Sequence, residues 1–169
     1  TTPDYVACHV PAYLHMYDVL KGLKKGGSFL LNSIWDEEET KNNLPDAMKK
    51  YMAKNEIKFY IINGTKLGED LGLGTRTNTI MQSAFFKITG VIPYEMAVDQ
   101  MKTAIVKSYG NKGEHIVKMN YSAVEAGGKN VVTVEVPTEW KDIVVGEVEI
   151  DAKRPKYIKN VVDVINGQR

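Results

Sequence analysis

The chain has a single cysteine, Cys8, among its 169 residues. One thiol excludes an intrachain disulfide framework, and it excludes an iron–sulfur cluster held by this chain alone, because a cluster needs several thiolates. The three histidines and the cysteine are scattered and lack the close spacing of protein zinc ligands, so we expect no metal site. Cys8 lies in a short apolar run, and we interpret it as a buried, inert side chain.

The chain also has no large excess of charge of one sign, because it contains 22 basic and 21 acidic residues. This balance gives no overall field that would attract nucleic acid or an anionic membrane. No apolar run approaches the roughly 20 residues that cross a bilayer, and the start of the chain lacks the basic and apolar regions of a secretory leader. We therefore expect a soluble, cytoplasmic protein with no nucleic-acid or membrane partner.

Three apolar runs alternate with helical patterns in the first 62 residues. The runs cover 4–10, 28–33 and 57–62, and each is continuous rather than alternating, which is typical of parallel strands covered on both faces. Helical spacing follows from Pro11 to Leu23, and helices are expected again at the acidic stretch 36–39 and after Pro45. The pattern predicts an α/β fold with an open, mainly parallel sheet flanked by helices.

The pattern becomes wholly helical after Asn63 and Gly64. Helices are expected near 67–71 and over 76–88, 93–109 and 114–126. We interpret Gly72 and Gly74 as helix-ending residues, with a new N-cap at Thr75, because the segment lacks a phosphate-binding fingerprint. These helices would form a C-terminal cap on a domain spanning 1–128. Residues 129–169, including an amphipathic stretch at 155–166, are expected to form an extended linker.

Polar residues stand where each predicted strand ends. Cys8 and His9, Asn32 and Ser33, and Asn63 and Gly64 occupy these positions. Ligands of open α/β sheets bind at the carboxyl ends of the strands, but asparagine and serine at such junctions equally suit helix caps. His9 has no accompanying acid or base in a recognisable pattern, and no serine has a nucleophile context. The residues alone therefore identify no reaction and no catalytic group.

Several strings, in order, resemble the middle of pyruvate:ferredoxin (flavodoxin) oxidoreductases. The resemblance covers nearly the whole chain, and the tail from Tyr157 to Asn166 resembles the linker of that family. The strings that carry it are Asp4-Tyr5-Val6-Ala7-Cys8-His9, Phe29-Leu30-Leu31-Asn32-Ser33-Ile34-Trp35, Asn43-Leu44-Pro45, Lys58-Phe59-Tyr60, Gly72-Leu73-Gly74, Met81-Gln82-Ser83-Ala84-Phe85-Phe86-Lys87, Val91-Ile92-Pro93-Tyr94 and Ala104-Ile105-Val106-Lys107-Ser108-Tyr109.

The resemblance implies an internal segment: the C-terminal part of the γ-type domain, followed by a linker toward a ferredoxin-like domain. Enzymes of this family convert pyruvate and coenzyme A to acetyl-CoA and carbon dioxide and pass electrons to ferredoxin or flavodoxin. They use thiamine diphosphate, magnesium and [4Fe-4S] clusters, none of which the resemblance places in this segment. It implies that the partners are the other domains of the same polypeptide and the electron carrier, in an intact homodimer, and that the segment alone is inactive.

The resemblance also suggests a ligand for the polar strand ends. His9, Asn32, Ser33, Asn63 and Lys66 are the candidate contacts to coenzyme A. Three alternatives stay open: a non-catalytic interaction module that docks on neighbouring domains, the γ domain of another 2-oxoacid:ferredoxin oxidoreductase, and an independent small nucleotide-binding protein. The last ranks lowest because the chain has no phosphate-binding motif.

Overall fold

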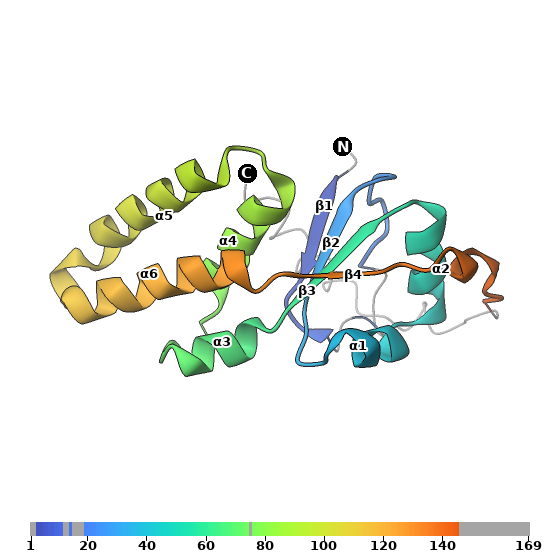
Figure 1. Ribbon diagram of the computed structural model, residues 1–169, viewed down its shortest axis with the longest axis horizontal. Coiled ribbons are helices and arrows are strands. Elements are labelled where there is room, and N and C mark those ends of the chain that lie inside the picture. Colours follow the sequence, from blue (N-terminus) through green and yellow to red (C-terminus); the bar gives the residue numbers. More distant parts are fainter. Residues whose placement is uncertain (1–2, 12–13, 15–18, 75, 146–169) are drawn as a thin grey trace. The chain divides into compact units, whose positions relative to one another are not determined.

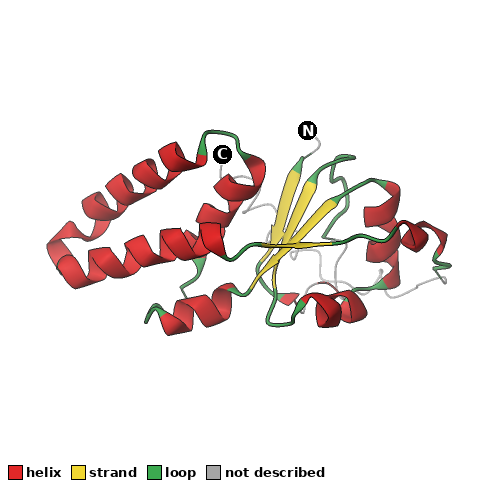
Figure 2. Cartoon of the chain, in the orientation of Figure 1, coloured by secondary structure: helices red, strands yellow, loops and turns green. Residues whose placement is uncertain are grey.

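The computed structural model describes residues 3–11, 14, 19–74 and 76–145. The chain divides into two compact units: unit 1 comprises Thr1–Ile61 and Val132–Arg169, and unit 2 comprises Ile62–Val131. Within the described residues, unit 1 contains the sheet and its helices, whereas unit 2 is built from helices (Figure 2).

The sheet has four strands in the order β1-β2-β3-β4: β1 (Tyr5–Cys8), β2 (Ser28–Asn32), β3 (Lys58–Ile62) and β4 (Val132–Val134) (Figure 1). β1 pairs with β2 in parallel, and β4 pairs with β3 in the antiparallel direction. The predicted α/β fold with a mainly parallel sheet is confirmed. β4 comes from the stretch expected to be linker, because its β-branched residues pair along β3. The boundary at residue 128 stays a prediction.

Side chains on both faces of β1 and β2 are buried, as the continuous apolar runs predicted. Val6 and Ala7 point to opposite faces, and each is only 1% exposed. Phe29 of β2 and Phe59 of β3 stack with ring centroids 5.5 Å apart. A buried aromatic side chain of this kind contributes about 1.5–3 kcal/mol to folding, so these strands carry much of the core of unit 1.

The helices of unit 1 begin where the sequence indicated. α1 (Glu37–Asn43) starts at Asp36, whose carboxylate accepts from the Glu39 N–H at 2.8 Å, while the Glu39 carboxylate accepts from the Asp36 N–H at 3.3 Å. This reciprocal capping satisfies two helix-end donors. α2 (Asp46–Lys54) follows Pro45, and the short helix η3 (Thr138–Asp142) packs on α2. A helix was expected from Pro11 to Leu23: residues 12–13 and 15–18 of that range lie outside the described residues, and residues 19–22 form a turn and no helix.

Unit 2 contains α3 (Gly64–Asp70), α4 (Asn78–Thr89), α5 (Tyr94–Tyr109), η2 (Gly110–Lys112) and α6 (Glu114–Lys129). α6 packs against both α4 and α5, and Met101, Ile105 and Val124 form the centre of a small core. The four predicted helices are thus present. Gly72, with φ +84°, follows the end of α3, as expected.

Two helix boundaries of unit 2 differ from the predictions. The N-cap of α4 is Thr77, and Thr75, the expected cap, lies outside the described residues. α6 does not stop near Ala126 but continues through Gly127 and Gly128 to Lys129. Gly127 packs against α4 and Gly128 against Tyr94 of α5, where a larger residue would clash, and this tertiary packing overrides the low helix propensity of glycine. The amphipathic stretch at 155–166 is outside the described residues, and none of the described helices is long and apolar enough to span a membrane.

Candidate functional site

The ends of β1 and β2 bring three of the five candidate residues together in unit 1. His9 directly follows β1, and Asn32 and Ser33 stand at the end of the neighbouring parallel strand β2. The Asn32 Nδ2 donates to the His9 carbonyl oxygen at 3.1 Å, and the Asn32 side chain is buried. This bond links the two strand ends and places Asn32 beside His9.

The His9 imidazole has an unsatisfied polar atom. Its Nε2 is buried and has no hydrogen-bond partner in the part of the chain that the structure describes. Burial lowers the pKa of His9 below its ordinary value, so the ring is neutral at neutral pH. A buried polar atom without a partner is costly. A ligand that offered a donor or acceptor to Nε2 would remove that cost.

The thiol of Cys8, the residue before His9, is in an environment that makes it unreactive. The thiol is 1% exposed and donates to the Val10 carbonyl oxygen at 3.2 Å. Burial raises the pKa of Cys8 to about 11, which keeps the thiol protonated at neutral pH. Because the thiolate is the reactive form, this geometry agrees with the interpretation of Cys8 as an inert side chain.

The Ser33 hydroxyl forms hydrogen bonds within the turn that connects β2 to α1. Its Oγ accepts from the Trp35 N–H at 3.0 Å and lies 3.1 Å from the Thr40 Oγ1. Ser33 is 1% exposed, and Thr40 is fully buried. These contacts hold the start of α1 against the strand end. Ser33 therefore positions the turn beside His9 and Asn32.

Asn63 and Lys66 lie together in unit 2, at the start of α3. The Asn63 Oδ1 accepts from the Lys66 backbone N–H at 3.0 Å, which makes Asn63 the N-cap of α3. The Lys66 Nζ is 3.4 Å from the Asp70 Oδ2, and both side chains are largely exposed. Such a pair contributes little stability. The capping interpretation thus accounts for Asn63, while Lys66 presents a cation to solvent.

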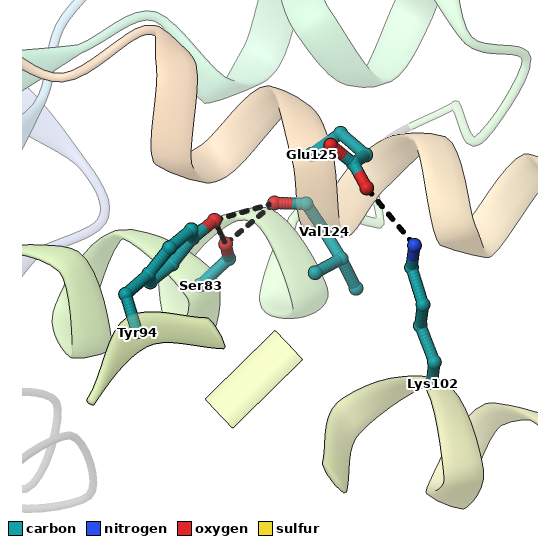
Figure 3. Close-up of polar contacts among 5 residues, drawn as sticks. All are labelled: Ser83, Tyr94, Lys102, Val124 and Glu125. Carbon is teal, nitrogen blue, oxygen red and sulfur yellow. Dashed lines mark hydrogen bonds and ion pairs between the residues drawn. The ribbon is translucent and has the colours of Figure 1, made fainter. Parts of the chain in front are cut away.

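A buried hydroxyl pair in unit 2 escaped the sequence analysis. The Ser83 Oγ donates to the Val124 carbonyl oxygen at 2.5 Å and lies 2.9 Å from the Tyr94 hydroxyl, which donates to the same carbonyl at 3.3 Å (Figure 3). Both hydroxyls donate to a backbone carbonyl, so we interpret the cluster as structural. The paired glycines Gly127 and Gly128, inside a helical pattern, were the available signal.

The described residues offer binding groups rather than a catalytic set. They contain no cluster of three histidine, cysteine, aspartate or glutamate side chains that could hold a metal ion. A pocket of about 350 Å³ in unit 2 lies between α4 and α5 and contains none of the candidate residues; Gln82, Phe86, Gln100, Met101 and Ser108 are among its lining residues. The strand ends of unit 1 and the start of α3 remain the candidate ligand contacts.

Comparison with known proteins places the chain in a family. A family model described as pyruvate ferredoxin/flavodoxin oxidoreductase matches residues 1–129. A pyruvate-flavodoxin oxidoreductase of Enterobacter agglomerans is 46% identical over 98% of this chain, and a pyruvate:ferredoxin oxidoreductase of Moorella thermoacetica is 42% identical over 97%. In both cases the chain spans only 14% of the length of the relative.

One further relative and one solved structure are similar to this chain. A pyruvate dehydrogenase [NADP(+)] of Cryptosporidium parvum is 39% identical over 81% of the chain, which covers 7% of that protein. The crystal structure of the pyruvate oxidoreductase subunit PORC of Thermotoga maritima has the same fold, with a TM-score of 0.63 and 20% identity over 79% of this chain and 66% of that one. The chain belongs to the pyruvate ferredoxin/flavodoxin oxidoreductase family.

Proposed function

We propose that this chain is an internal segment of a pyruvate:ferredoxin or pyruvate:flavodoxin oxidoreductase. The complete enzyme would convert pyruvate and coenzyme A to acetyl-CoA and carbon dioxide and pass the electrons to its carrier protein. The observation that carries this proposal is the 46% identity over 98% of the chain to a relative of which the chain is only 14%. The segment would act in the scaffold between domains and have no activity alone.

Thiamine diphosphate with magnesium and [4Fe-4S] clusters would supply the decarboxylation and electron-transfer chemistry of the complete enzyme. The residues of this chain do not suit a cluster, because its one cysteine is buried and protonated at neutral pH. We therefore assign these groups to other domains. We further propose that the enzyme is a cytoplasmic homodimer that serves anaerobic metabolism.

The division of the chain follows the same proposal. Residues 1–128 would be the C-terminal part of the γ-type domain, and residues 129–169 the linker toward a ferredoxin-like domain. The family match supports this boundary, because it ends at residue 129. β4 lies in the proposed linker and pairs with β3 of the γ-type domain. The first residues of the linker would therefore form an additional strand of the sheet of that domain.

We propose that the strand-end residues contact coenzyme A in the complete enzyme. The buried, neutral His9 Nε2 suits an amide or hydroxyl group of the ligand, and the exposed Lys66 ammonium suits a phosphate. Asn32 would hold His9 in place through the bond to the His9 carbonyl. Ser33 and Asn63 would act through the turn and the helix cap that they form.

The contact to coenzyme A is tested by titrating coenzyme A against the complete enzyme with pyruvate and a viologen dye as the electron acceptor. Lys66→Ala should raise the KM for coenzyme A about tenfold, equivalent to about 1.4 kcal/mol, with kcat nearly unchanged. Asn32→Ala should also raise the KM, and Lys107→Ala, at an exposed lysine of α5, is the matched control. An unchanged KM in both site variants would disprove the contact.

The enzyme proposal itself has a separate test. The native polypeptide should be several times longer than this chain, contain iron and thiamine diphosphate, and reduce the dye with pyruvate in preference to other 2-oxoacids. A native chain of 18.9 kDa without iron or thiamine would contradict the proposal and favour a non-catalytic interaction module. Activity on another 2-oxoacid alone would assign the chain to a related oxidoreductase.

A further inference from the structure

Two loops of unit 1 lie side by side at the edge where the parallel strands begin (Figure 1). The loop before β2 and the loop before β3 are joined by the Gly26 N–H, which donates to the Asn55 carbonyl, and by the Lys58 N–H, which donates to the Gly27 carbonyl, both at 2.8 Å. Five exposed lysines stand on these loops or at the adjoining ends of α2 and β3, and they form what we call the lysine edge: Lys21, Lys24, Lys25, Lys54 and Lys58.

The backbone that carries the lysine edge is tightly constrained. The Lys24 N–H donates to the Pro3 carbonyl at 2.8 Å. A β-carbon at Gly27 would stand 2.8 Å from the Lys24 carbonyl oxygen and 3.0 Å from the Asp4 carbonyl oxygen, so only glycine is accommodated there. Gly26 has φ +80°, which also favours glycine. The lysines are therefore presented from a defined surface and not from a loosely held loop.

Among the described residues, little negative charge balances this edge. The carboxylates nearest to it there are Asp4, which precedes β1, and Glu56, both exposed, and the Lys25 Nζ lies 4.0 Å from the Glu56 Oε2. At that distance between exposed side chains the pair is weak. Within the part of the chain that the structure describes, five lysines against two carboxylates give a local positive field, whereas the net charge of the whole chain is only +1.

The lysine edge has no apolar or aromatic anchor. The large hydrophobic side chains that are exposed in the described residues, Val10, Ile34, Val91, Met96, Val106, Val132, Val144 and Val145, all lie on other segments. Among the described residues the edge contains no arginine; the nearby Tyr5 is buried, and Tyr51 is half-buried and donates to the Leu23 carbonyl. Insertion into a membrane and stacking on nucleic-acid bases are therefore disfavoured. An acidic protein surface is the partner that suits this chemistry.

Because lysine–carboxylate contacts are weak, an acidic domain of the same polypeptide suits the lysine edge better than a separate protein does. Exposed lysine–carboxylate pairs are individually weak, so that a few of them give a separate protein a dissociation constant of about 1 mM or weaker. A domain tethered in the same polypeptide reaches an effective concentration of about 1 mM, which is comparable to this dissociation constant and allows reversible docking. The chain spans 14% of its relatives, so most of such a polypeptide lies outside it.

We propose that the lysine edge docks against an acidic surface of another domain in the complete polypeptide. This inference rests on the proposed function in one respect, namely that the chain is a segment of a longer enzyme. The contact is electrostatic and reversible, as contacts between domains that move relative to one another commonly are. It lies at the opposite end of the strands from His9 and Asn32, and it is independent of the coenzyme A contacts.

Cross-linking with a carbodiimide tests the contact directly, because this reagent joins a lysine amine to a carboxylate that touches it. In the complete polypeptide at about 0.01 M salt, lysines of the edge should become linked to aspartate or glutamate residues of another domain. The yield should fall about tenfold at about 1 M salt, where the Debye length is about 3 Å. Links confined to Asp4 or Glu56, or formed only with added ferredoxin or flavodoxin, would overturn the proposal.

Charge reversal gives a second, independent test. The triple variant Lys24→Glu, Lys25→Glu and Lys58→Glu should increase the radius of gyration of the complete polypeptide at low salt, whereas the control triple Lys107→Glu, Lys129→Glu and Lys141→Glu should not. All six lysines are exposed, and circular dichroism would verify the fold. Equal radii for both variants would contradict the proposal. Pyruvate-dependent dye reduction, measured on the unmodified enzyme, reports on the proposed function separately.

Discussion

Gly127 of α6 lies so close to Ser83 of α4 that a β-carbon at position 127 would stand 2.7 Å from the Ser83 Cβ. It would also overlap the Ile80 carbonyl oxygen. The next residue, Gly128, faces the Tyr94 ring in the same way. The two glycines therefore allow α6 to approach α4 and the start of α5 closely enough for the hydroxyls of Ser83 and Tyr94 to reach the Val124 carbonyl (Figure 3).

Gly127→Ala should destabilise the protein by about 1–3 kcal/mol. Overpacking against backbone atoms has a cost of this size and outweighs the gain of about 1 kcal/mol in helix propensity. The free energy of unfolding from urea titration measures the effect. Gly110→Ala is the matched control, because Gly110 has helical dihedral angles and its β-carbon would meet only Val106 at 3.8 Å. Equal stability of the two variants would contradict the close approach of α4 and α6.

Ser83→Ala should cost about 1–2 kcal/mol, because it removes a buried hydrogen bond and leaves the Tyr94 hydroxyl with one acceptor. Ser122→Ala, at an exposed position of α6, should be nearly neutral. A double-mutant cycle with Tyr94→Phe should show coupling, because both hydroxyls share the Val124 carbonyl. Strictly additive effects would mean that the two hydroxyls act separately.

Glu56→Gly should stabilise the protein by about 0.5–1 kcal/mol. Glu56 has φ +52° just after α2, in the pattern where the Ile57 N–H donates to the Met52 carbonyl, a position that usually holds glycine. Relief of this strain outweighs the added freedom of the unfolded chain. Thermal unfolding measures the change. The converse variant is Gly26→Ala. A β-carbon at position 26 would meet no other atom, but φ is +80°, which strains an alanine, so this variant should destabilise the protein.

Stability should fall as the pH is lowered through the range in which histidine titrates. Burial lowers the pKa of His9 in the folded state, so below about pH 6.5 the unfolded chain binds a proton that the folded chain does not. The loss continues until the pH reaches the lowered pKa and then levels off. Urea titrations across this range should show the slope, and His9→Gln should reduce it. His115→Gln, at an exposed position on α6, is the control.

Local sequence patterns predicted most secondary-structure elements correctly. Continuous apolar runs located β1, β2 and β3, and the acidic stretch with Asp36 located the start of α1. These signals depend on residues within a few positions of one another, so they can be interpreted without knowledge of the fold. The strand ends followed from the same patterns, which is why His9, Asn32 and Ser33 were grouped in advance.

The sequence by itself determined the α/β class, the family and the positions of the candidate residues. Only the tertiary structure decided that residues 132–134 join β3, that α6 runs through Gly127 and Gly128, and that Asn63 caps α3. It alone left the His9 Nε2 buried without a partner among the described residues. The reason is physical: propensity and periodicity report on neighbours along the chain, whereas pairing, close packing and burial depend on atoms that folding brings from distant positions.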